Sequence, residues 1–306
     1  MNTPANPAAA IEKGLFHTPF WLAPTADVFA QRSVRFQELA AAENSQWRDY
    51  LALLGKLAAA QQAVAAKHVF ALPPTHQGHT VLPQAALGEV PADFYAVLAG
   101  LLAEVGTQAP QSVQAELNAL AALPRAAAEA LASRVLSGSS TPEEQAATVW
   151  VQAALQIIWT AWAAQLLEDA VPPVQERTHC PCCGTEAVGS VVFASGDLAG
   201  LRYMHCPHCN SRWNALRAKC PTCDSSGGMA IQEIDTDAAV AQVAPLLAAK
   251  AESCDVCHSY RKLYRLEKQQ YADPLADDLA SLGLDILVGE GGYQRAGANP
   301  FLLLGG

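Results

Sequence analysis

Residues 180–223 read CPCCGTEAVGSVVFASGDLAGLRYMHCPHCNSRWNALRAKCPTC and contain three of the four Cys-x-x-Cys pairs in the chain. The turn between two cysteines at this spacing directs both side chains to one side, so one pair supplies half of a tetrahedral metal site. Four pairs supply two sites. The spacing therefore predicts two mononuclear tetrathiolate sites whose ligands are Cys180, Cys183, Cys206, Cys209, Cys220, Cys223, Cys254 and Cys257.

Two ways of pairing these turns are open. Successive pairs can join, so that Cys180, Cys183, Cys206 and Cys209 bind one ion, or alternate pairs can join in a cross-braced arrangement. We favour the first, because the 22 residues between Cys183 and Cys206 can form a strand hairpin that returns one turn to face the next. Zinc ribbons and rubredoxins have this arrangement.

The residue types around the pairs do not distinguish iron from zinc as the bound metal. Tetrahedral sulfur coordination suits both metals, whereas neither ferredoxin spacing of an iron–sulfur cluster appears. Each site already has four thiolates. We therefore expect the neighbouring histidines to support the ligands or to lie at the surface, and the ninth cysteine to be a partly exposed thiol outside the ligand set; these residues are His179, His205, His208, His258 and Cys182.

Composition and charge exclude several functions. The 306 residues include 19 Lys plus Arg and 29 Asp plus Glu, and the formal net charge of −10 disfavours nucleic-acid binding.

The first residues do not form a signal peptide, so we expect a cytoplasmic protein with reduced thiols. A thiol–disulfide enzyme is an alternative, but four pairs in a reducing compartment favour metal. Motifs for phosphate binding or hydrolysis do not appear, and we predict a non-enzyme.

Residues 24–170 show a helical period. Residues 145–167 carry no charge and would extend about 34 Å as a helix, which is long enough to span a membrane. A stripe of Gln and Thr and acidic flanks favour a buried central helix instead. Thr141 to Glu144 predict a capping box at its start. The other expected helices are Thr25–Ala42, one from Ser45, Pro91–Val105, Ser112–Leu123 and one after Pro124, with a loop at Val69–Val90.

Beyond residue 177 short runs of strand-forming residues replace the helical period. We expect strands at Val188–Phe193, Leu201–His205, Arg212–Arg217, Met229–Ile234 and Tyr260–Glu267. A helix is expected at Thr236–Ala251 and another at Pro274–Val288, with Asp277 and Asp278 on a solvated face. The predicted class is α+β: a helical domain (1–172), two rubredoxin-like or zinc-ribbon-like units with short antiparallel strands (173–218 and 219–270), and a closing helix and tail (271–306).

Cations alternate with aromatic residues close to the cysteine turns. Such a mixture is typical of protein interfaces and also of sites for single-stranded RNA. Because the chain is acidic, we interpret this set as a surface for a protein partner; its residues are Arg202, Tyr203, Arg212, Trp213 and Arg217.

The chain resembles the FdhE family of formate dehydrogenase accessory proteins. The resemblance rests on the four ordered Cys-x-x-Cys pairs, on Pro19-Phe20, and on the segments Gly200–Cys206, Lys250–Cys254, Ala276–Leu282 and Asn299–Leu302. It implies a cytoplasmic protein that binds the catalytic, molybdopterin-containing subunit of respiratory formate dehydrogenase and supports its maturation before twin-arginine export. It also implies two rubredoxin-type iron ions at the eight paired cysteines.

Two alternatives remain open at this point. One is that the chain is a zinc-ribbon interaction module with purely structural zinc. The other concerns oligomeric state, because a homodimer is compatible with the sequence.

Overall fold

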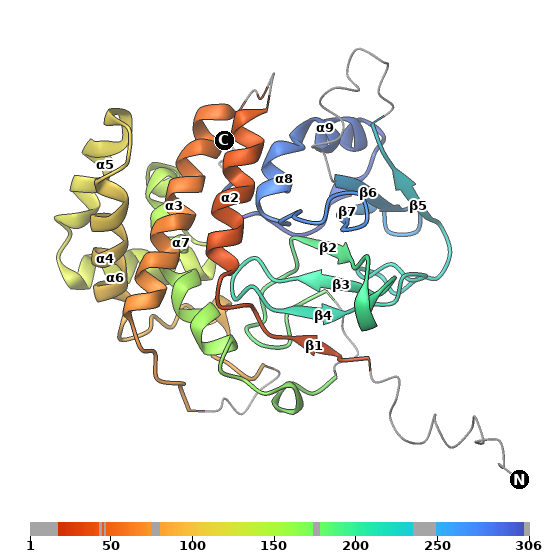
Figure 1. The fold of residues 1–306 in the computed structure, drawn as a ribbon, viewed down its shortest axis with the longest axis horizontal. Helices are drawn as coiled ribbons and strands as arrows, with labels where there is room; N and C mark the ends of the chain where they lie inside the picture. Colours follow the sequence, from red (N-terminus) through yellow and green to blue (C-terminus); the bar gives the residue numbers. More distant parts are fainter. Residues whose placement is uncertain are drawn as a thin grey trace, which may run out of the picture.

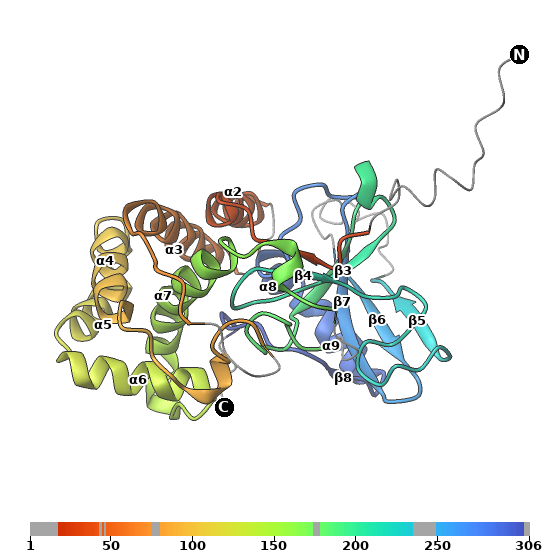
Figure 2. The same ribbon diagram turned by 90° about the horizontal axis from the view of Figure 1, so that it is seen from below.

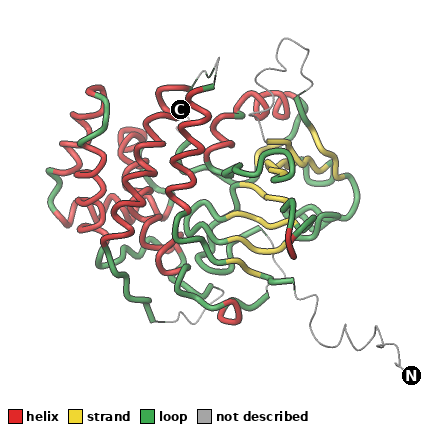
Figure 3. The backbone as a smooth tube through the Cα atoms, viewed as in Figure 1, coloured by secondary structure: helices red, strands yellow, loops and turns green. Residues whose placement is uncertain are grey.

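Most helices lie on one side of the molecule and the strands lie on the other, where two short helices near the C-terminus pack beside the strands (Figures 1 and 3). The computed structural model describes residues 18–42, 45, 47–74, 80–173, 178–234 and 249–302. The helical side contains six main helices, at the positions where the hydrophobic period predicts them: α2 (Val28–Ala41), α3 (Arg48–Lys67), α4 (Phe94–Gly106), α5 (Gln111–Ala121), α6 (Arg125–Ser137) and α7 (Gln145–Ala163).

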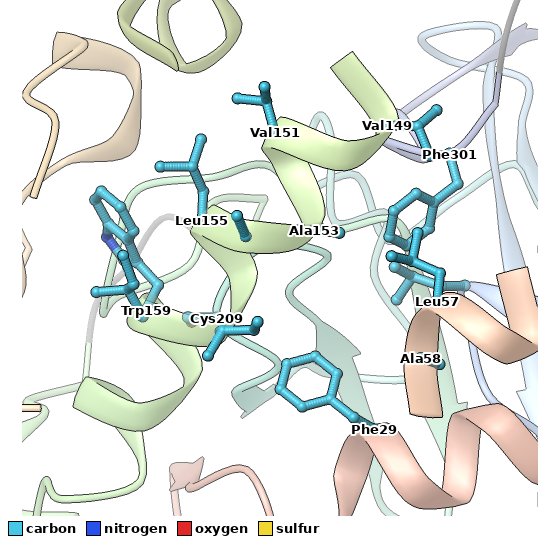
Figure 4. Close-up of a cluster of buried hydrophobic side chains, with 14 of the residues drawn as sticks. Phe29, Leu57, Ala58, Val149, Val151, Ala153, Leu155, Trp159, Cys209 and Phe301 are labelled. Atoms are coloured by element: carbon cyan, nitrogen blue, oxygen red, sulfur yellow. The ribbon is translucent and has the colours of Figure 1, made fainter. Parts of the chain in front are cut away.

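Helix α7 is the centre of the helical side and packs against α3, α4, α5 and α6. Its uncharged sequence is buried over most of its circumference, and Figure 4 shows Val151, Leu155 and Trp159 projecting from it into the core. Its polar stripe is satisfied internally, since Gln156 accepts a hydrogen bond from Gln61 of α3 (2.9 Å). Among the described residues, no helix combines the length and the apolarity that crossing a membrane requires. The prediction of a buried central helix is confirmed.

The start of α7 has the predicted capping box. Thr141 donates its backbone N–H to Glu144 (3.0 Å), and the Thr141 side chain accepts the reciprocal bond across the short 3-10 turn Pro142–Glu144. Glu144 also pairs with Arg134 at the end of α6 (2.5 Å). The cap therefore fixes the turn between α6 and α7 as well as satisfying the first N–H groups of the helix.

The described strands form one sheet of eight, in the order β1-β4-β3-β2-β7-β6-β5, with β8 beside β7. Figure 2 shows this sheet beside the helical side. Most neighbours are antiparallel, whereas β2–β7 and β7–β8 are parallel. The strands are β1 (Trp21–Leu22), β2 (Gly189–Val192), β3 (Arg202–His205), β4 (Arg212–Asn214), β5 (Met229–Gln232), β6 (Ala249–Cys254), β7 (Ser259–Arg265) and β8 (Gln294–Arg295).

The sheet contains the same unit twice. In each unit a cysteine pair precedes a strand hairpin, a second pair follows it, and a third strand returns along the hairpin: β2, β3 and β4 in the first unit, β5, β6 and β7 in the second. The hairpin predicted between Cys183 and Cys206 is confirmed. The two units join edge to edge, because β2 pairs with β7, for example Val191 with Tyr264.

The predicted helix at Thr236–Ala251 is wrong where the structure describes it. Residues 236–248 lie outside the described residues, and Ala249–Ala251 belong to β6. The sequence Ala249-Lys250-Ala251-Glu252 has helix-forming residue types. Its backbone pairs with β7 on one side and, from Ala251 onwards, with β5 on the other, so tertiary pairing overrides local propensity.

The predicted closing helix is two short helices, α8 (Ala276–Ala280) and α9 (Leu282–Glu290). The break lies at Ser281, whose hydroxyl donates to the carbonyl of Asp277 (2.6 Å). The ammonium of Lys262 donates hydrogen bonds to the carbonyls of Asp278 (2.8 Å) and Ser281 (3.2 Å). These carbonyls are diverted from the hydrogen bonds that would continue one helix.

The prediction that Asp277 and Asp278 lie on a solvated face is wrong. Their exposed fractions are 1% and 0%. Asp277 accepts hydrogen bonds from Arg35 of α2 (Nε to Oδ2 3.0 Å), and Asp278 pairs with Arg295 (2.6 Å) and Lys262 (3.0 Å). The Asp277 pair therefore joins α8 to α2, and the Asp278 pairs join α8 to β7 and β8. Single-helix periodicity does not reveal these partners.

Candidate metal centres

The eight paired cysteines form two groups of four, and the sulfur atoms within each group lie within 4.8 Å of one another. The groups join successive pairs, as the hairpin argument predicts. We call Cys180, Cys183, Cys206 and Cys209 the first thiol group, and Cys220, Cys223, Cys254 and Cys257 the second thiol group.

The spacing of the sulfur atoms fits one ion in each group. The distances across the first group are 3.5 Å for Cys180–Cys209 and 3.5 Å for Cys183–Cys206. Across the second they are 3.8 Å for Cys220–Cys257 and 3.7 Å for Cys223–Cys254. A tetrahedral ion with metal–sulfur bonds of about 2.3 Å places its sulfurs about 3.8 Å apart. The chain thus presents two donor sets of the size that a tetrathiolate ion requires.

All four cysteine turns share a backbone conformation. The residue after the second cysteine has a positive φ in each turn: 74° at Gly184, 58° at Asn210, 56° at Asp224 and 52° at His258. Glycine adopts this conformation freely, and Asn, Asp and His are the side chains that tolerate it best. The turns therefore have the same shape although only one of them contains glycine.

We expect Gly184→Ala to lower the free energy of unfolding by about 1–2 kcal/mol, because an L side chain is disfavoured in this left-handed conformation. The new Cβ would also lie 2.9 Å from Cγ of Gln84, which must move. Denaturant unfolding measures the change. Gly227→Ala is a matched control, because nothing lies within 4 Å of a Cβ at that position. An unchanged midpoint for Gly184→Ala would contradict the expectation.

A hydroxyl residue lies two positions after each pair, a repeated signal that the Cys-x-x-Cys pattern alone overlooks. In three turns the hydroxyl oxygen lies close to the sulfur: 3.4 Å for Thr185 and Cys183, 3.3 Å for Ser211 and Cys209, and 3.0 Å for Ser259 and Cys257. In the fourth, the carbonyl of Ser225 accepts the N–H of Cys220 (2.8 Å). Here the thiols of Cys183 and Cys209 donate to these hydroxyls. A hydroxyl that turned to donate to the ionised sulfur would stabilise the form that binds metal.

The pKa values of the thiols differ within each group. Burial raises the pKa of Cys180, whereas hydrogen bonds from the neighbouring thiols lower the pKa of Cys209 against the effect of its burial. In the second group burial of Cys257 opposes ionisation, but hydrogen bonds, first from Ser259, lower its pKa to about 7. Each group thus contains one cysteine that ionises more readily than an ordinary thiol.

None of the four histidines is part of either thiol group. His205 and His208 are buried, and burial lowers their pKa to about 3 and about 4, so both rings are neutral at pH 7. The Nδ1 atom of His208 lies 2.8 Å from the amide nitrogen of Gln152, and its ring centroid lies 4.7 Å from that of Trp159. This imidazole packs the second cysteine turn against α7. His179 and His258 are exposed.

The prediction of a partly exposed Cys182 is wrong. Its side chain is 0% exposed and its sulfur lies 3.7 Å from the hydroxyl of Ser211. The carbonyl of Cys182 accepts the N–H of Leu82 (2.8 Å), so the loop before α4 covers this turn. Cys182 belongs to neither thiol group.

The predicted docking surface of cations and aromatic residues is also wrong in most of its members. Arg202, Tyr203 and Trp213 are 1%, 0% and 0% exposed. Arg202 pairs with Glu252 of β6 (2.8 Å) and so connects the two units of the sheet. Arg212 is half-buried and donates through Nε to His205 (3.3 Å). Of the five residues only Arg217 is exposed. Trp213 belongs to the main hydrophobic core, and Tyr203 belongs to a smaller cluster with Val191 and Tyr264.

Comparisons with known proteins agree over nearly the whole chain. Three family models match consecutive segments: FdhE, N-terminal (residues 18–176), FdhE, central domain (179–217) and FdhE, C-terminal domain (218–302).

Individual relatives lead to the same assignment. The chain is 34% identical over 298 residues to the FdhE homolog of Edwardsiella ictaluri, covering 94% of this chain and 92% of that protein. It is 34% identical over 293 residues to the homolog of Pseudomonas aeruginosa, with 92% of each covered. The crystal structure of the FdhE protein from Pseudomonas aeruginosa matches with a TM-score of 0.79 at 33% identity, covering 94% of this chain and 100% of that one. The chain belongs to the FdhE family.

Proposed function

We propose that this chain is an accessory protein that binds the catalytic, molybdopterin-containing subunit of formate dehydrogenase in the cytoplasm and supports its maturation before twin-arginine export. The observation that carries the proposal is family membership from residue 18 to residue 302, together with eight thiols gathered in two groups of four. Membership of the FdhE family supports a role for this chain in the formation of formate dehydrogenase.

The thiol groups support a non-catalytic role. Four protein sulfurs around one ion leave no open position for a substrate, which is the arrangement of structural metal sites. The first group lies where the helices meet the sheet, since Cys209 belongs to the same buried cluster as Trp159 and Phe29 (Figure 4). An ion there would cross-link the two cysteine turns of the first unit against α7.

We propose iron as the metal in both groups, with zinc as the alternative. Bound iron would supply a one-electron change between ferrous and ferric states, whereas zinc would supply the cross-link alone. The eight paired cysteines provide the donor set for either ion, and the left-handed turns position them.

Metal analysis of anaerobically purified protein, with its visible spectrum, tests the metal proposal. We expect two ions per chain and the visible absorption of ferric tetrathiolate after oxidation. A colourless protein with two zinc ions would contradict iron as the metal and support zinc. Protein that purifies free of metal under these conditions would overturn the assignment of all eight cysteines.

Co-purification tests the partner. The tagged chain should retain the catalytic subunit of formate dehydrogenase from cells grown under conditions that induce the enzyme, and deletion of the gene should lower formate dehydrogenase activity. The matched control is the tag alone in the same cells, which should retain no formate dehydrogenase subunit. If no formate dehydrogenase subunit co-purified and deletion left formate dehydrogenase activity unchanged, the proposal would be wrong.

A further inference from the structure

We propose that the two metal sites have different lifetimes: the second thiol group exchanges its ion with metal-binding solutes, whereas the first thiol group keeps its ion as long as the protein is folded. The inference rests on the proposed metal binding. It assigns to Cys220, Cys223, Cys254 and Cys257 the role of an exchangeable site for a thiophilic divalent cation.

Burial differs sharply between the groups. The four cysteines of the first group are 1%, 0%, 0% and 0% exposed. In the second group Cys223 is exposed and Cys257 is partly exposed, while Cys220 and Cys254 are buried. A solute can therefore approach the second group from the side of Cys223 without any change in the fold.

The first group is covered on both of its turns. The loop before α4 donates three backbone hydrogen bonds to the turn at residues 180–183, from Val81 to Pro181 (3.3 Å), from Leu82 to Cys182 (2.8 Å) and from Ala85 to Cys183 (3.1 Å). Helix α7 hydrogen-bonds the other turn, where Gln156 donates to the carbonyl of Pro207 (2.6 Å). Access to these sulfurs requires separation of α7 or of this loop from the sheet.

Among the described residues, the turns of the second group hydrogen-bond to loops and strand ends, whereas α7 holds one turn of the first group. The carbonyl of Pro221 accepts the hydroxyl of Thr178 (2.7 Å), and the N–H of Asp255 donates to Gly228 (2.8 Å). The tips of both turns are open, since Thr222 is exposed and Val256 is 60% exposed. Local opening of such a segment costs much less free energy than opening of the core.

The proposed exchange is a substitution at the ion without a change of oxidation state. An incoming chelator or thiolate binds the ion from the exposed side, the bonds to the four cysteine sulfurs break in turn, and the released thiolates either bind a new ion or take up protons from water. Cys223 is the first sulfur that the entering ligand reaches.

The test uses the full chain loaded with two Zn²⁺ or Cd²⁺ ions and mixed with an excess of a coloured chelator. We expect two phases of one ion each, with rates that differ on the order of 100-fold or more, because the slow ion requires opening of the core. Alkylation followed by mass spectrometry should modify Cys223 and Cys257 during the fast phase and leave the first thiol group unmodified.

A variant assigns the phases. Cys223→Ser should lose the fast phase and keep the slow one, whereas Thr222→Ala, an exposed neighbour on the same turn, should keep both. Two bound ions that leave in a single phase, or alkylation of both groups at equal rates, would overturn the inference while leaving metal binding intact. A chain that loads no ion at all would overturn the proposed metal binding and, with it, this inference.

Discussion

Replacing Cys206 by serine is expected to abolish the native fold, under conditions in which the Cys223→Ser chain still unfolds cooperatively. Structural tetrathiolate or related sites contribute an apparent binding free energy of about 10–16 kcal/mol. The total stability of a domain is about 5–15 kcal/mol. Loss of one ligand from the buried first group therefore removes a contribution as large as the stability itself. Circular dichroism and calorimetry of the purified variants measure this loss of the native fold.

The surroundings of Cys206 make this effect larger than at an exposed ligand. Its sulfur accepts the backbone N–H groups of His208 and Cys209 (both 3.4 Å), and these donors would be left without their thiolate in the core. The matched control is Cys182→Ala, a buried cysteine beside the same group that is no ligand, with an expected loss of about 1 kcal/mol. A Cys206→Ser chain that unfolds at the wild-type temperature would contradict the cross-linking role.

The sequence is most informative where structure depends on neighbours in the chain. Cysteine spacing predicts both thiol groups and the hairpin between Cys183 and Cys206, and the run from Thr141 to Glu144 predicts the cap of α7. These features depend on residues a few positions apart or on segments that follow one another in the chain. The domain boundaries at residues 172, 218 and 270 stay a prediction.

Features that depend on distant partners are those that the sequence misses. Arg35 and Asp277 are 242 positions apart, so Asp277 looks like an ordinary surface residue on a short helix. The same holds for Arg202, which is buried because Glu252 of the other unit pairs with it. Strand β6 has helix-forming residues and becomes a strand only between β5 and β7. Burial of a charge cannot be seen without its partner.

This dependence leads to the second large prediction, at the ion pair between α2 and α8. Asp277→Ala is expected to lower the free energy of unfolding by about 3 kcal/mol, because the buried guanidinium of Arg35 loses its buried carboxylate. Its pair with Glu38 (3.0 Å) remains, but the side chain of Glu38 is 42% exposed. Both side chains are 1% exposed and their closest N–O distance is 2.5 Å. Asp277 also accepts the N–H of Asp273 (2.8 Å), so the start of α8 loses its acceptor as well. Denaturant unfolding monitored by circular dichroism measures the loss.

Two comparisons separate the loss of the buried carboxylate partner of Arg35 from a simple loss of packing. In Arg35→Met with Asp277→Ala, neither charge of the pair remains, so the double variant should be more stable than Asp277→Ala alone. Glu129→Ala breaks an exposed pair with Arg125, whose side chain is 59% exposed, and should cost no more than about 0.5 kcal/mol. If the double variant lost as much as both single changes added together, the cost would lie in packing, and α8 would be positioned by shape rather than by charge.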